Sequence, residues 1–280
     1  MKRPVYQSIP RVLSGYRLVG MSTLQAFRKK TEFLPAPGTR RTAVVVLDAF
    51  RCSSTLLACF SSGVAAAVLQ EKGLPSGTSS SSARALADAW GLELVLGGEL
   101  HGKPVPGGIV GNSPIDACDS GRLNNRLLHF QSTNFAKVFV EVCEYAAAAS
   151  PGMDVYVIGF PNVGATAKRV ISGHYDAIYV VCAGFYDCLA LEDMILAGSL
   201  ISRIAPHENT IDDEALAMLG CYRTYQDDVD RYKNSWSGRI LQHLGKWTDV
   251  DDIVDANQLP PLYLAPRCFK WVERSGACHA

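Results

Sequence analysis

The chain has 280 residues, of which 48% are hydrophobic and 19% are charged, so it can bury a sizeable core and does not have the composition of a disordered protein. Basic and acidic side chains each number 27, and the resulting zero net charge argues against a general nucleic-acid-binding surface. No apolar run is as long as a membrane span, and the N-terminus lacks a signal-peptide core. We therefore expect a soluble protein that acts without nucleic-acid or membrane partners.

The cysteines indicate a reducing environment. There are nine of them, an odd number, and no two have Cys-x-x-Cys spacing. Several lie in apolar runs, as Cys182 does at the end of residues 178–182. Small buried side chains in such runs are typical of reduced thiols. The sequence predicts mostly free thiols and a cytoplasmic location.

The first 41 residues show no clear periodicity and end in the turn-rich stretch Leu34–Thr39. Basic side chains are frequent there, as in Arg28, Lys29 and Lys30. A basic arm that contacts nucleic acid would have this composition, and so would a solvated extension. We interpret residues 1–41 as an N-terminal extension.

The first regular unit begins with the apolar run Thr42–Leu47, which predicts a strand buried on both faces. Ser53, Ser54 and Thr55 precede the apolar residues 56–60, and such residues mark the start of a helix. The segment between the two is therefore a strand-to-helix turn. In doubly wound sheets, ligands bind at such turns, which lie at the carboxyl ends of the strands.

Further strands and helices alternate along the chain, which predicts a layered α/β/α fold with mixed or parallel sheets. A Ser-rich stretch, residues 76–82, has the composition of a flexible loop. Later, a Pro-rich run predicts an extended strand at an edge or a crossing connection. The expected elements are helix 83–90, strand 92–96, the Gly- and Pro-rich loop 102–114, strand 127–131, helix 138–149, strand 154–158, helix 163–171, strand 177–182 and the extended segment 259–266.

Two of these units have the same layout. Each position of the second unit lies 111 residues after its counterpart, as Thr166 does after Thr55. This spacing predicts two related halves, residues 42–150 and 151–280, although α/β units also look alike by chance. Because the second unit has no counterpart of Asp48 and Arg51, we expect the chemistry in the first.

The first polar cluster follows strand 42–47. Asp48 has the oxygen ligands that a hard cation prefers, and Arg51 can bind a phosphate or sulfonate through two parallel hydrogen bonds. Ser53, Ser54 and Thr55 offer hydroxyls and backbone N–H groups to an anion. A turn aspartate and an N-cap serine would give the same local sequence.

Two further clusters follow predicted strands. Glu99 follows two glycines, and Asn112 and Ser113 end a loop whose glycines allow close approach to a ligand. Thr133 and Asn134 could bind ligand oxygens after strand 127–131. An ordinary Gly-rich loop and a helix cap are the alternatives for these clusters. His101 is the one histidine near a cluster, and we do not assign it a catalytic role.

The fourth cluster combines Gly184 with the paired carboxylates Glu192 and Asp193. These carboxylates could be metal ligands or a general base, or they could be charges favoured at a helix start by the helix dipole. Cys182 has no cationic neighbour in sequence, so a structural thiol explains it better than a nucleophile.

In order and spacing, the four clusters resemble the 2-phosphosulfolactate phosphatase family of coenzyme M biosynthesis over roughly residues 42–268. The segment Ser237–Leu241 and the residues from Asp249 to Pro266 are also similar to that family. The matching segments are Val44–Thr55, Gly98–Glu99, Gly111–Pro114, Thr133–Asn134, Cys182–Gly184, Leu191–Asp193 and Ala197–Gly198. The resemblance implies a layered α/β fold of two related halves and a magnesium-dependent phosphatase that releases a sulfonated or otherwise acidic hydroxy acid.

The sequence departs from the family at positions where the family has anion donors. Leu100 replaces an Arg, and Phe135 and Ala136 replace the Gly-Thr of a Thr-Asn-Gly-Thr-Arg segment. Ile109 and Val110 replace Phe-Asp. We expect these residues to line an apolar pocket, so that the substrate lacks the sulfonate of phosphosulfolactate.

Together the clusters predict Mg²⁺-dependent hydrolysis of a small acidic phosphate ester. In this hypothesis Asp48, Glu99 and Asp193 or Glu192 hold one Mg²⁺, and Arg51 stabilises charge on the transferring group. The expected catalytic residues are Asp48, Arg51, Glu99 and Glu192. The expected substrate-binding residues are Ser53, Ser54, Thr55, Asn112, Ser113, Thr133, Asn134 and Gly184. A different reaction on an acidic metabolite, and an inactive binding or partner protein, remain alternatives, and a homodimer is left open.

Overall fold

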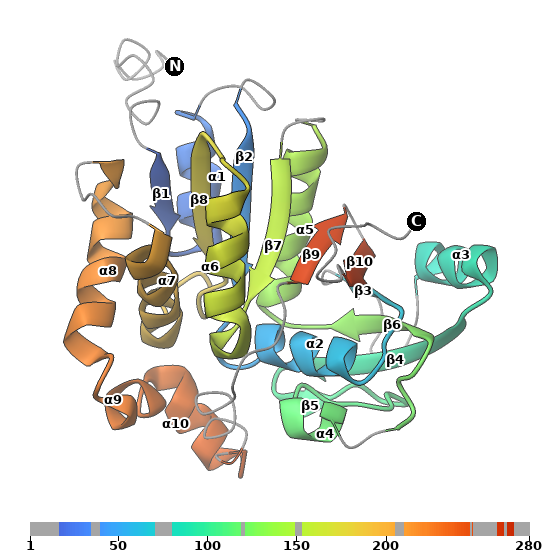
Figure 1. Cartoon of the computed structure of the whole chain (residues 1–280). Helices are drawn as coiled ribbons and strands as arrows, with labels where there is room; N and C mark the ends of the chain where they lie inside the picture. The colour runs from blue at the N-terminus through green and yellow to red at the C-terminus, as the bar shows by residue number, and fades with distance from the viewer. Residues whose placement is uncertain are drawn as a thin grey trace, which may run out of the picture.

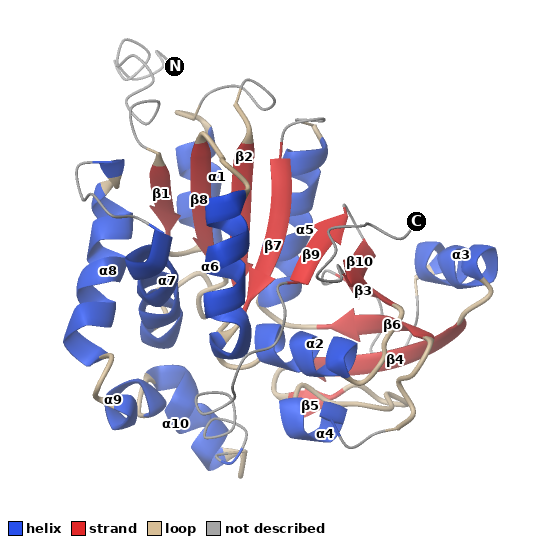
Figure 2. Ribbon diagram, viewed as in Figure 1, coloured by secondary structure: helices blue, strands red, loops and turns tan. Residues whose placement is uncertain are grey.

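The computed structural model describes residues 17–34, 40–70, 80–118, 121–148, 153–204, 210–246, 248, 262–265 and 268–271. Strands and helices alternate along the chain (Figures 1 and 2). The strands are β1 (Leu18–Met21), β2 (Thr42–Leu47), β3 (Ala66–Gln70), β4 (Glu93–Leu100), β5 (Lys103–Pro104), β6 (Arg126–Gln131), β7 (Met153–Ile158), β8 (Ala177–Cys182), β9 (Leu262–Ala265) and β10 (Cys268–Trp271). The α-helices are α1 (Leu24–Thr31), α2 (Cys52–Ser61), α3 (Ser81–Trp90), α4 (Pro114–Cys118), α5 (Phe135–Ala147), α6 (Val163–Ser172), α7 (Leu191–Ile204), α8 (Asp213–Tyr225), α9 (Val229–Lys233) and α10 (Trp236–His243).

The described strands form one sheet in the order β1-β8-β2-β7-β9-β10-β3-β6-β4-β5. Two groups of parallel strands lie within it, β1-β8-β2-β7 and β3-β6-β4. The antiparallel pair β9–β10 joins the two groups by pairing with β7 on one side and β3 on the other. In the view of Figure 1 the strands of the second group run across the direction of the first. The sheet is therefore mixed but mostly parallel, as the sequence predicts.

The side chains of β2 alternate between two hydrophobic clusters, so helices cover both faces of the first strand group. All six side chains of the strand are buried. Val44 and Val46 pack in one hydrophobic cluster with α1, α2 and α5. Val45 and Leu47 pack in another with α6, α7 and α8. A smaller cluster packs α3 against β3 and β6. Helices on both sides of a parallel sheet make the layered α/β/α fold that the sequence predicts.

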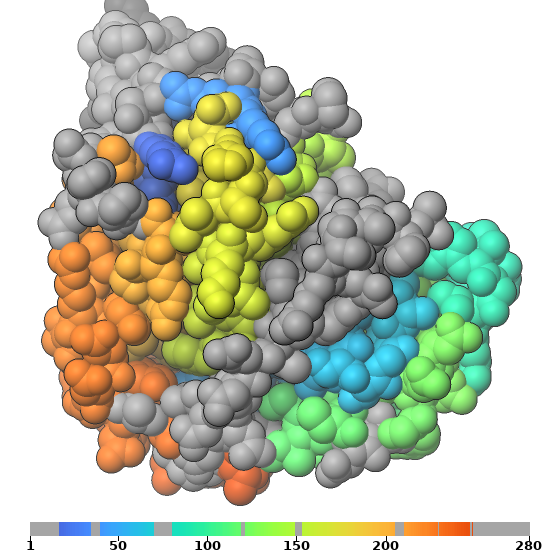
Figure 3. All heavy atoms as spheres, viewed as in Figure 1, coloured from blue at the N-terminus to red at the C-terminus, as the bar shows by residue number. Residues whose placement is uncertain are grey.

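The repeated layout expected from the sequence is present in the backbone. β2 and β7 have the same length, as do α2 and α6. The two strands are parallel neighbours that pair Thr42 with Met153 and Leu47 with Ile158. The chain then diverges, because α2 leads to β3 in the second strand group whereas α6 leads to β8 beside β2. In Figure 3, α6 is a yellow-green ridge on the visible face, between the orange α8 and the blue α2.

Part of the segment expected as an N-terminal extension belongs to the fold. All four residues of β1 are buried, and the strand pairs with β8 from Leu18 to Met21. Leu24 and Phe27 of α1 pack into the core. Four residues are too few to show a hydrophobic period, which explains why the sequence pattern does not reveal β1. The expected segment 259–266 contains β9, and its other residues lie outside the described ones, as do those of the Ser-rich stretch before Ser80.

Two sequence-level expectations bear on the environment of the protein. No helix among the described residues is long and apolar enough to cross a bilayer. Seven cysteines are described as free thiols, of which Cys52, Cys59, Cys143 and Cys182 are buried. The remaining two, at positions 268 and 278, have no described side chain.

Candidate functional site

The carboxyl ends of strands from both groups meet at one cavity of about 240 Å³. Asp48 and Arg51 reach it after β2, Glu99 and His101 from the end of β4, and Thr133 after β6. The side of the cavity opposite these strand ends is formed by α10. Its wall residues are Asp48, Phe50, Arg51, Glu99, His101, Gly102, Asn112, Ser132, Thr133, Asn134, Phe185, Tyr186, Ser237, Ile240, Leu241 and Leu244.

The turn after β2 directs the side chains of Asp48 and Arg51 toward the cavity. The hydroxyl side chains that follow in the same turn stay in the interior. The Ser53 hydroxyl accepts a hydrogen bond from the Asp48 backbone N–H at 2.9 Å, and the Thr55 hydroxyl donates to the Arg51 carbonyl at 3.1 Å. Ser53, Ser54 and Thr55 are buried and are absent from the cavity wall. Ser53 and Thr55 therefore shape the turn at positions where the sequence suggested contact with substrate, whereas the buried Ser54 hydroxyl has no hydrogen-bond partner among the described residues.

Asp193 links two strand-end loops. One carboxylate oxygen accepts the Ala49 N–H at 2.7 Å, and the other accepts the Gly184 N–H at 2.9 Å. Gly184 has φ +67°, and a side chain there would place its Cβ 2.6 Å from the Cys188 carbonyl oxygen. Neither Gly184 nor Asp193 lies in the wall of the cavity. Because both carboxylate oxygens hold backbone N–H groups, the geometry favours a positioning role for Asp193 over the ligand role expected from the sequence.

Glu99 joins the end of β4 to the loop after β6. Its carboxylate accepts hydrogen bonds from the Thr133 N–H at 2.9 Å, the Thr133 hydroxyl at 3.3 Å and the Gly102 N–H at 2.6 Å. The preceding Gly98 has φ +98°, and a Cβ there would lie 2.0 Å from the Gln131 carbonyl oxygen. A glycine is thus required for the close approach of the two strands. Glu99 lies in the cavity wall and holds Thr133 there.

The remaining expected substrate-binding residues divide between wall and interior. Asn112 lies in the wall, and its buried Oδ1 has no hydrogen-bond partner among the residues that the structure describes. Asn134 also lies there, and its Oδ1 accepts from the Tyr186 N–H at 3.4 Å. Ser113 is buried, with its hydroxyl accepting from the Asp116 N–H at 3.3 Å. An unpartnered buried acceptor such as that of Asn112 is the kind of group that a ligand donor would satisfy.

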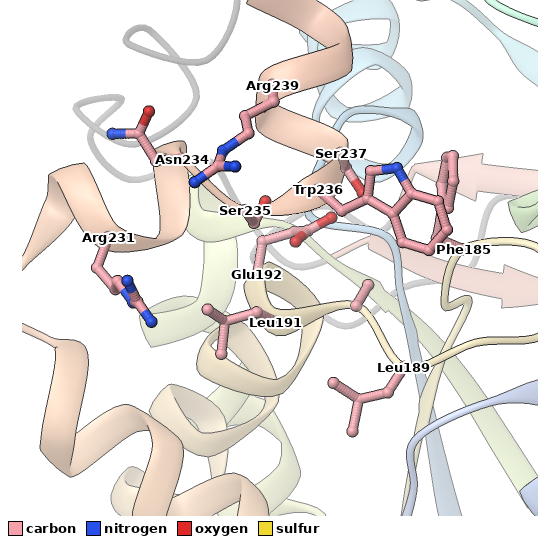
Figure 4. A pocket seen from close by; sticks show the side chains of 11 residues that line it. Phe185, Leu189, Leu191, Glu192, Arg231, Asn234, Ser235, Trp236, Ser237 and Arg239 are labelled. Atoms are coloured by element: carbon pink, nitrogen blue, oxygen red, sulfur yellow. The ribbon is translucent and has the colours of Figure 1, made fainter.

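Glu192 lies in the wall of an adjoining cavity of about 380 Å³ (Figure 4). The two cavities share Phe185 and Ser237 as wall residues. The Glu192 side chain is buried, and within the described part of the chain its Oε2 has no hydrogen-bond partner. The expected site residues that line a cavity are therefore divided between two neighbouring cavities.

The pKa values of Asp48, Glu192 and Asp193 are raised. Burial, together with the negative charges of Glu192 and Glu99, raises the pKa of Asp48 to about 7, against the opposing effects of the Cys52 N–H and Arg51. Burial, Asp48 and Glu192 hold the pKa of Asp193 well above its usual range. Burial also raises the pKa of Glu192, while hydrogen bonds from Ser237 and Ser235 lower it. This interior therefore concentrates negative charge that a bound cation would offset.

The described residues could bind a magnesium ion only in a site that has few protein ligands. Among the described residues, no group of three or more His, Cys, Asp and Glu side chains could hold a metal ion. Mg²⁺ in proteins usually keeps several waters and binds through one or two carboxylates together with substrate phosphate oxygens. Glu192 keeps an unpartnered oxygen. Asp48 makes one long bond, of 3.4 Å, from the Cys52 N–H. A two-carboxylate site is compatible with this donor set.

Several wall residues were not anticipated from the sequence. Ser237, Ile240, Leu241 and Leu244 lie on one face of the α10 segment, and this i, i+3, i+4, i+7 spacing was the available signal. Phe185 and Tyr186 belong to a two-residue turn closed by the Phe185–Cys188 backbone hydrogen bonds, which no sequence pattern predicts. His101, given no catalytic role, lies in the wall with its Nδ1 3.5 Å from the Tyr186 hydroxyl.

The residues that were expected to form an apolar pocket lining lie outside the walls of the two described cavities. Leu100, Ile109, Val110 and Phe135 are absent from the walls of both cavities. Phe135 is fully buried and stacks on Phe139, and Ala136 is fully buried beside it. The first turn of α5 faces the core. The replacement of Gly-Thr by Phe135 and Ala136 therefore removes no hydrogen-bond donor from the described cavity wall. Phe50, Phe185, Ile240, Leu241 and Leu244 form the apolar wall instead.

Comparisons with known proteins agree with this arrangement of motifs. The sequence profile of the 2-phosphosulpholactate phosphatase family matches residues 30–263. A protein of Gloeobacter violaceus named probable 2-phosphosulfolactate phosphatase is 29% identical over 85% of this chain and 92% of its own length. Proteins of the same name from a Synechococcus strain and from Deinococcus radiodurans are 28% and 26% identical, over 84% and 74% of this chain and 92% and 80% of their own lengths. The chain belongs to the 2-phosphosulpholactate phosphatase family, and the names of the family and its members describe phosphoric monoester hydrolases.

Proposed function

We propose that the protein hydrolyses a small acidic phosphate monoester with Mg²⁺ at the cavity after β2. The observation that carries the proposal is the buried placement of Asp48, Arg51 and Glu99 in one cavity wall, at the carboxyl ends of strands from both groups. Ligands of open α/β sheets bind at these strand ends. Family membership supports phosphate ester chemistry at this place.

In this proposal Asp48 and Glu192 hold the ion, and Glu99 and Asp193 position the loops that carry the site. Mg²⁺, when bound, withdraws charge from the phosphoryl oxygens and offsets the carboxylates. Arg51, a buried guanidinium in the wall, binds phosphoryl oxygens and stabilises the charge that develops on them. Thr133 and Asn112, which lie in the cavity wall, orient the ester, the latter through its side-chain amide N–H. Such positioning and charge stabilisation account for most of the catalysis of phosphoryl transfer.

We further propose that the substrate differs from phosphosulfolactate. The ground for this is the observed wall, in which Phe50, Phe185, Ile240, Leu241 and Leu244 give the cavity an apolar side. A carbon chain suits that side better than a second strongly hydrated group near the ester. The buried thiols support a reducing, cytoplasmic setting for the reaction.

A screen for phosphate release from small phosphorylated acids, run with Mg²⁺ and with chelator, tests the proposal. We expect hydrolysis that chelator abolishes and that added Mg²⁺ restores. Activity that survives complete removal of divalent ions would eliminate the metal from the proposal. Absence of phosphate release from every ester would favour the alternative of an inactive binding protein. A preference of more than about tenfold for phosphosulfolactate, roughly 1.4 kcal/mol, would restore the family's named substrate.

A further inference from the structure

The second cavity carries two arginines that the proposed reaction does not use. Leu191 and Glu192, at the start of α7, form one side of it, and Arg231, Asn234 and Arg239, from α9 and α10, form the other. Figure 4 shows the two arginine side chains on the α9–α10 side of the cavity and Leu191 and Glu192 on the α7 side. Its volume of about 380 Å³ exceeds the 240 Å³ of the first cavity. Space of this size suits more than a phosphate group.

Both arginines are available to a ligand. Within the described part of the chain neither guanidinium forms an ion pair with a carboxylate. The Arg231 guanidinium lies 5.9 Å from the centroid of the Tyr225 ring, a contact that leaves its N–H donors accessible. Arginine presents a planar set of donors that matches a carboxylate, and two arginines in one wall make an anion the matching ligand.

The opposite side of this cavity carries the carboxylate that the proposed function assigns to Mg²⁺. Glu192 is 2% exposed and lines the cavity, and its Oε2 has no hydrogen-bond partner among the described residues. Buried acceptors are nearly always satisfied in folded proteins, by protein groups or by bound molecules and ions. The two cavities share Phe185 and Ser237 as wall residues, so the arginines lie in the cavity next to the one that holds Arg51.

We propose that Arg231 and Arg239 bind a distal carboxylate of the substrate, several bonds from the phosphate ester. This inference rests on the proposed function and names its substrate class: a phosphate monoester of a carboxylic acid with an intervening carbon chain. Leu189, Leu191 and the exposed Trp236 provide apolar contacts for that chain. The carboxylate at one end and the phosphate at the other then fix the ester in the two adjoining cavities.

Two esters of equal chain length test the inference, 4-phosphooxybutanoate and butyl phosphate. The wild-type protein should hydrolyse the carboxylated ester with about tenfold higher kcat/KM, mostly through a lower KM. Arg239→Gln and Arg231→Gln should reduce this preference and leave hydrolysis of butyl phosphate unchanged. Arg84→Gln, at an exposed position of α3 outside both cavities, is the matched control. Equal hydrolysis of the two esters by the wild-type protein, or a preference that survives in the double Arg→Gln variant, would overturn the inference.

Calorimetric binding to the Asp48→Asn variant separates this inference from the proposed function. The variant should bind 4-phosphooxybutanoate about tenfold more tightly than butyl phosphate, and Arg231→Gln with Arg239→Gln in the same chain should equalise the two affinities. The expected binding difference without hydrolysis of either ester by the wild-type protein would contradict the proposed function and uphold the anion site. Hydrolysis of both esters with equal binding would uphold the function and overturn the anion site.

Discussion

Two neighbouring loops of the molecule share a backbone plan and differ in chemistry. β2 and β7 have equal length and lie side by side in register, and each leads into a helix of equal length, α2 or α6. The loop after β2 carries Asp48 and Arg51, whereas Gly159 and Asn162 occupy the corresponding places after β7. Asn162 Oδ1 accepts the Gly159 N–H at 2.9 Å, and its Nδ2 donates to the Val157 carbonyl at 3.1 Å. The second loop thus satisfies its own polar groups.

The difference shows that this loop geometry does not require charged residues, because the second loop adopts it without them. Asp48 has its pKa raised to about 7 by burial and by neighbouring carboxylates, so its ionised form is disfavoured in the metal-free fold. Perturbed acids in a cavity are a frequent mark of function. The predictions below test whether the first loop is specialised for chemistry and the second for packing.

Asp48→Asn should have the largest effect on activity. The change keeps the shape of the side chain and removes the charge that would hold a cation, so kcat/KM should fall by about a thousandfold, roughly 4 kcal/mol of transition-state stabilisation. Steady-state assays with the preferred ester from the phosphate screen give the measurement. Asp88→Asn, the same change at an exposed position of α3, should leave kcat/KM unaltered. An Asp48→Asn protein with wild-type turnover would place the chemistry elsewhere.

Arg51→Gln should reduce kcat/KM by about a hundredfold, because one preorganised donor to the transferring group is typically worth that much. The loss should appear for every phosphate ester alike, whether or not it has a second acid group. Comparison of a carboxylated and an uncarboxylated ester checks this point. A loss confined to the carboxylated ester would move Arg51 from the phosphoryl group to the distal acid.

Gly159→Ala should destabilise the protein by about 2 kcal/mol without changing the chemistry of the site. A Cβ at this position would lie 2.7 Å from the Ser54 hydroxyl and 3.3 Å from Leu57 Cδ1, so the second loop would be pushed away from α2. Urea unfolding measures the change. Gly164→Ala, in the same unit with no atom within 4 Å of its added Cβ, should be neutral or slightly stabilising. Equal stability of the two variants would contradict the packing role of the second loop.

Asp48 should also make the metal-free protein less stable as the pH rises. Its folded pKa of about 7 exceeds the ordinary 3.8, so its contribution is complete below pH 3.8 and is lost as the pH rises toward 7. Relative to Asp48→Asn, the wild-type protein should lose on the order of 2 kcal/mol between pH 5 and pH 7. Unfolding in the presence of chelator at both pH values gives this difference. A gap between the two proteins that does not change with pH would mean that Asp48 is not perturbed in the fold.

The sequence predicts the elements whose patterns are local and strong. The continuous apolar runs that become β2, β7 and β8 are found with boundaries within one residue, as is the constant spacing of the two units. β1 is missed because four residues carry no period. β9 is anticipated as an extended segment, but its place between the two strand groups depends on pairing with β7 and β10, which no local pattern encodes.

The sequence locates Asp48 directly after a buried strand and Glu99 at the end of a strand, and both side chains lie in the cavity wall. Site prediction is less successful for hydroxyl residues, because Ser53 and Thr55 serve the backbone of the turn. The residue that replaces the family's glycine, Phe135, was expected in the pocket wall. It begins α5 on the face that packs into the core. The spacing of Ser237, Ile240 and Leu241 indicates a shared helix face, but only the tertiary fold brings that face to the cavity.

The central claim, that the loop after β2 carries a cation-dependent site, is tested most directly by counting Mn²⁺ ions bound to the wild-type protein and to Asp48→Asn by electron paramagnetic resonance. Mn²⁺ accepts the same oxygen ligands as Mg²⁺ and is observed without any turnover. We expect the wild-type protein to bind one ion that Mg²⁺ displaces, and Asp48→Asn to bind that ion at least tenfold more weakly. Equal binding by the two proteins, or no displaceable ion in the wild type, would contradict the account.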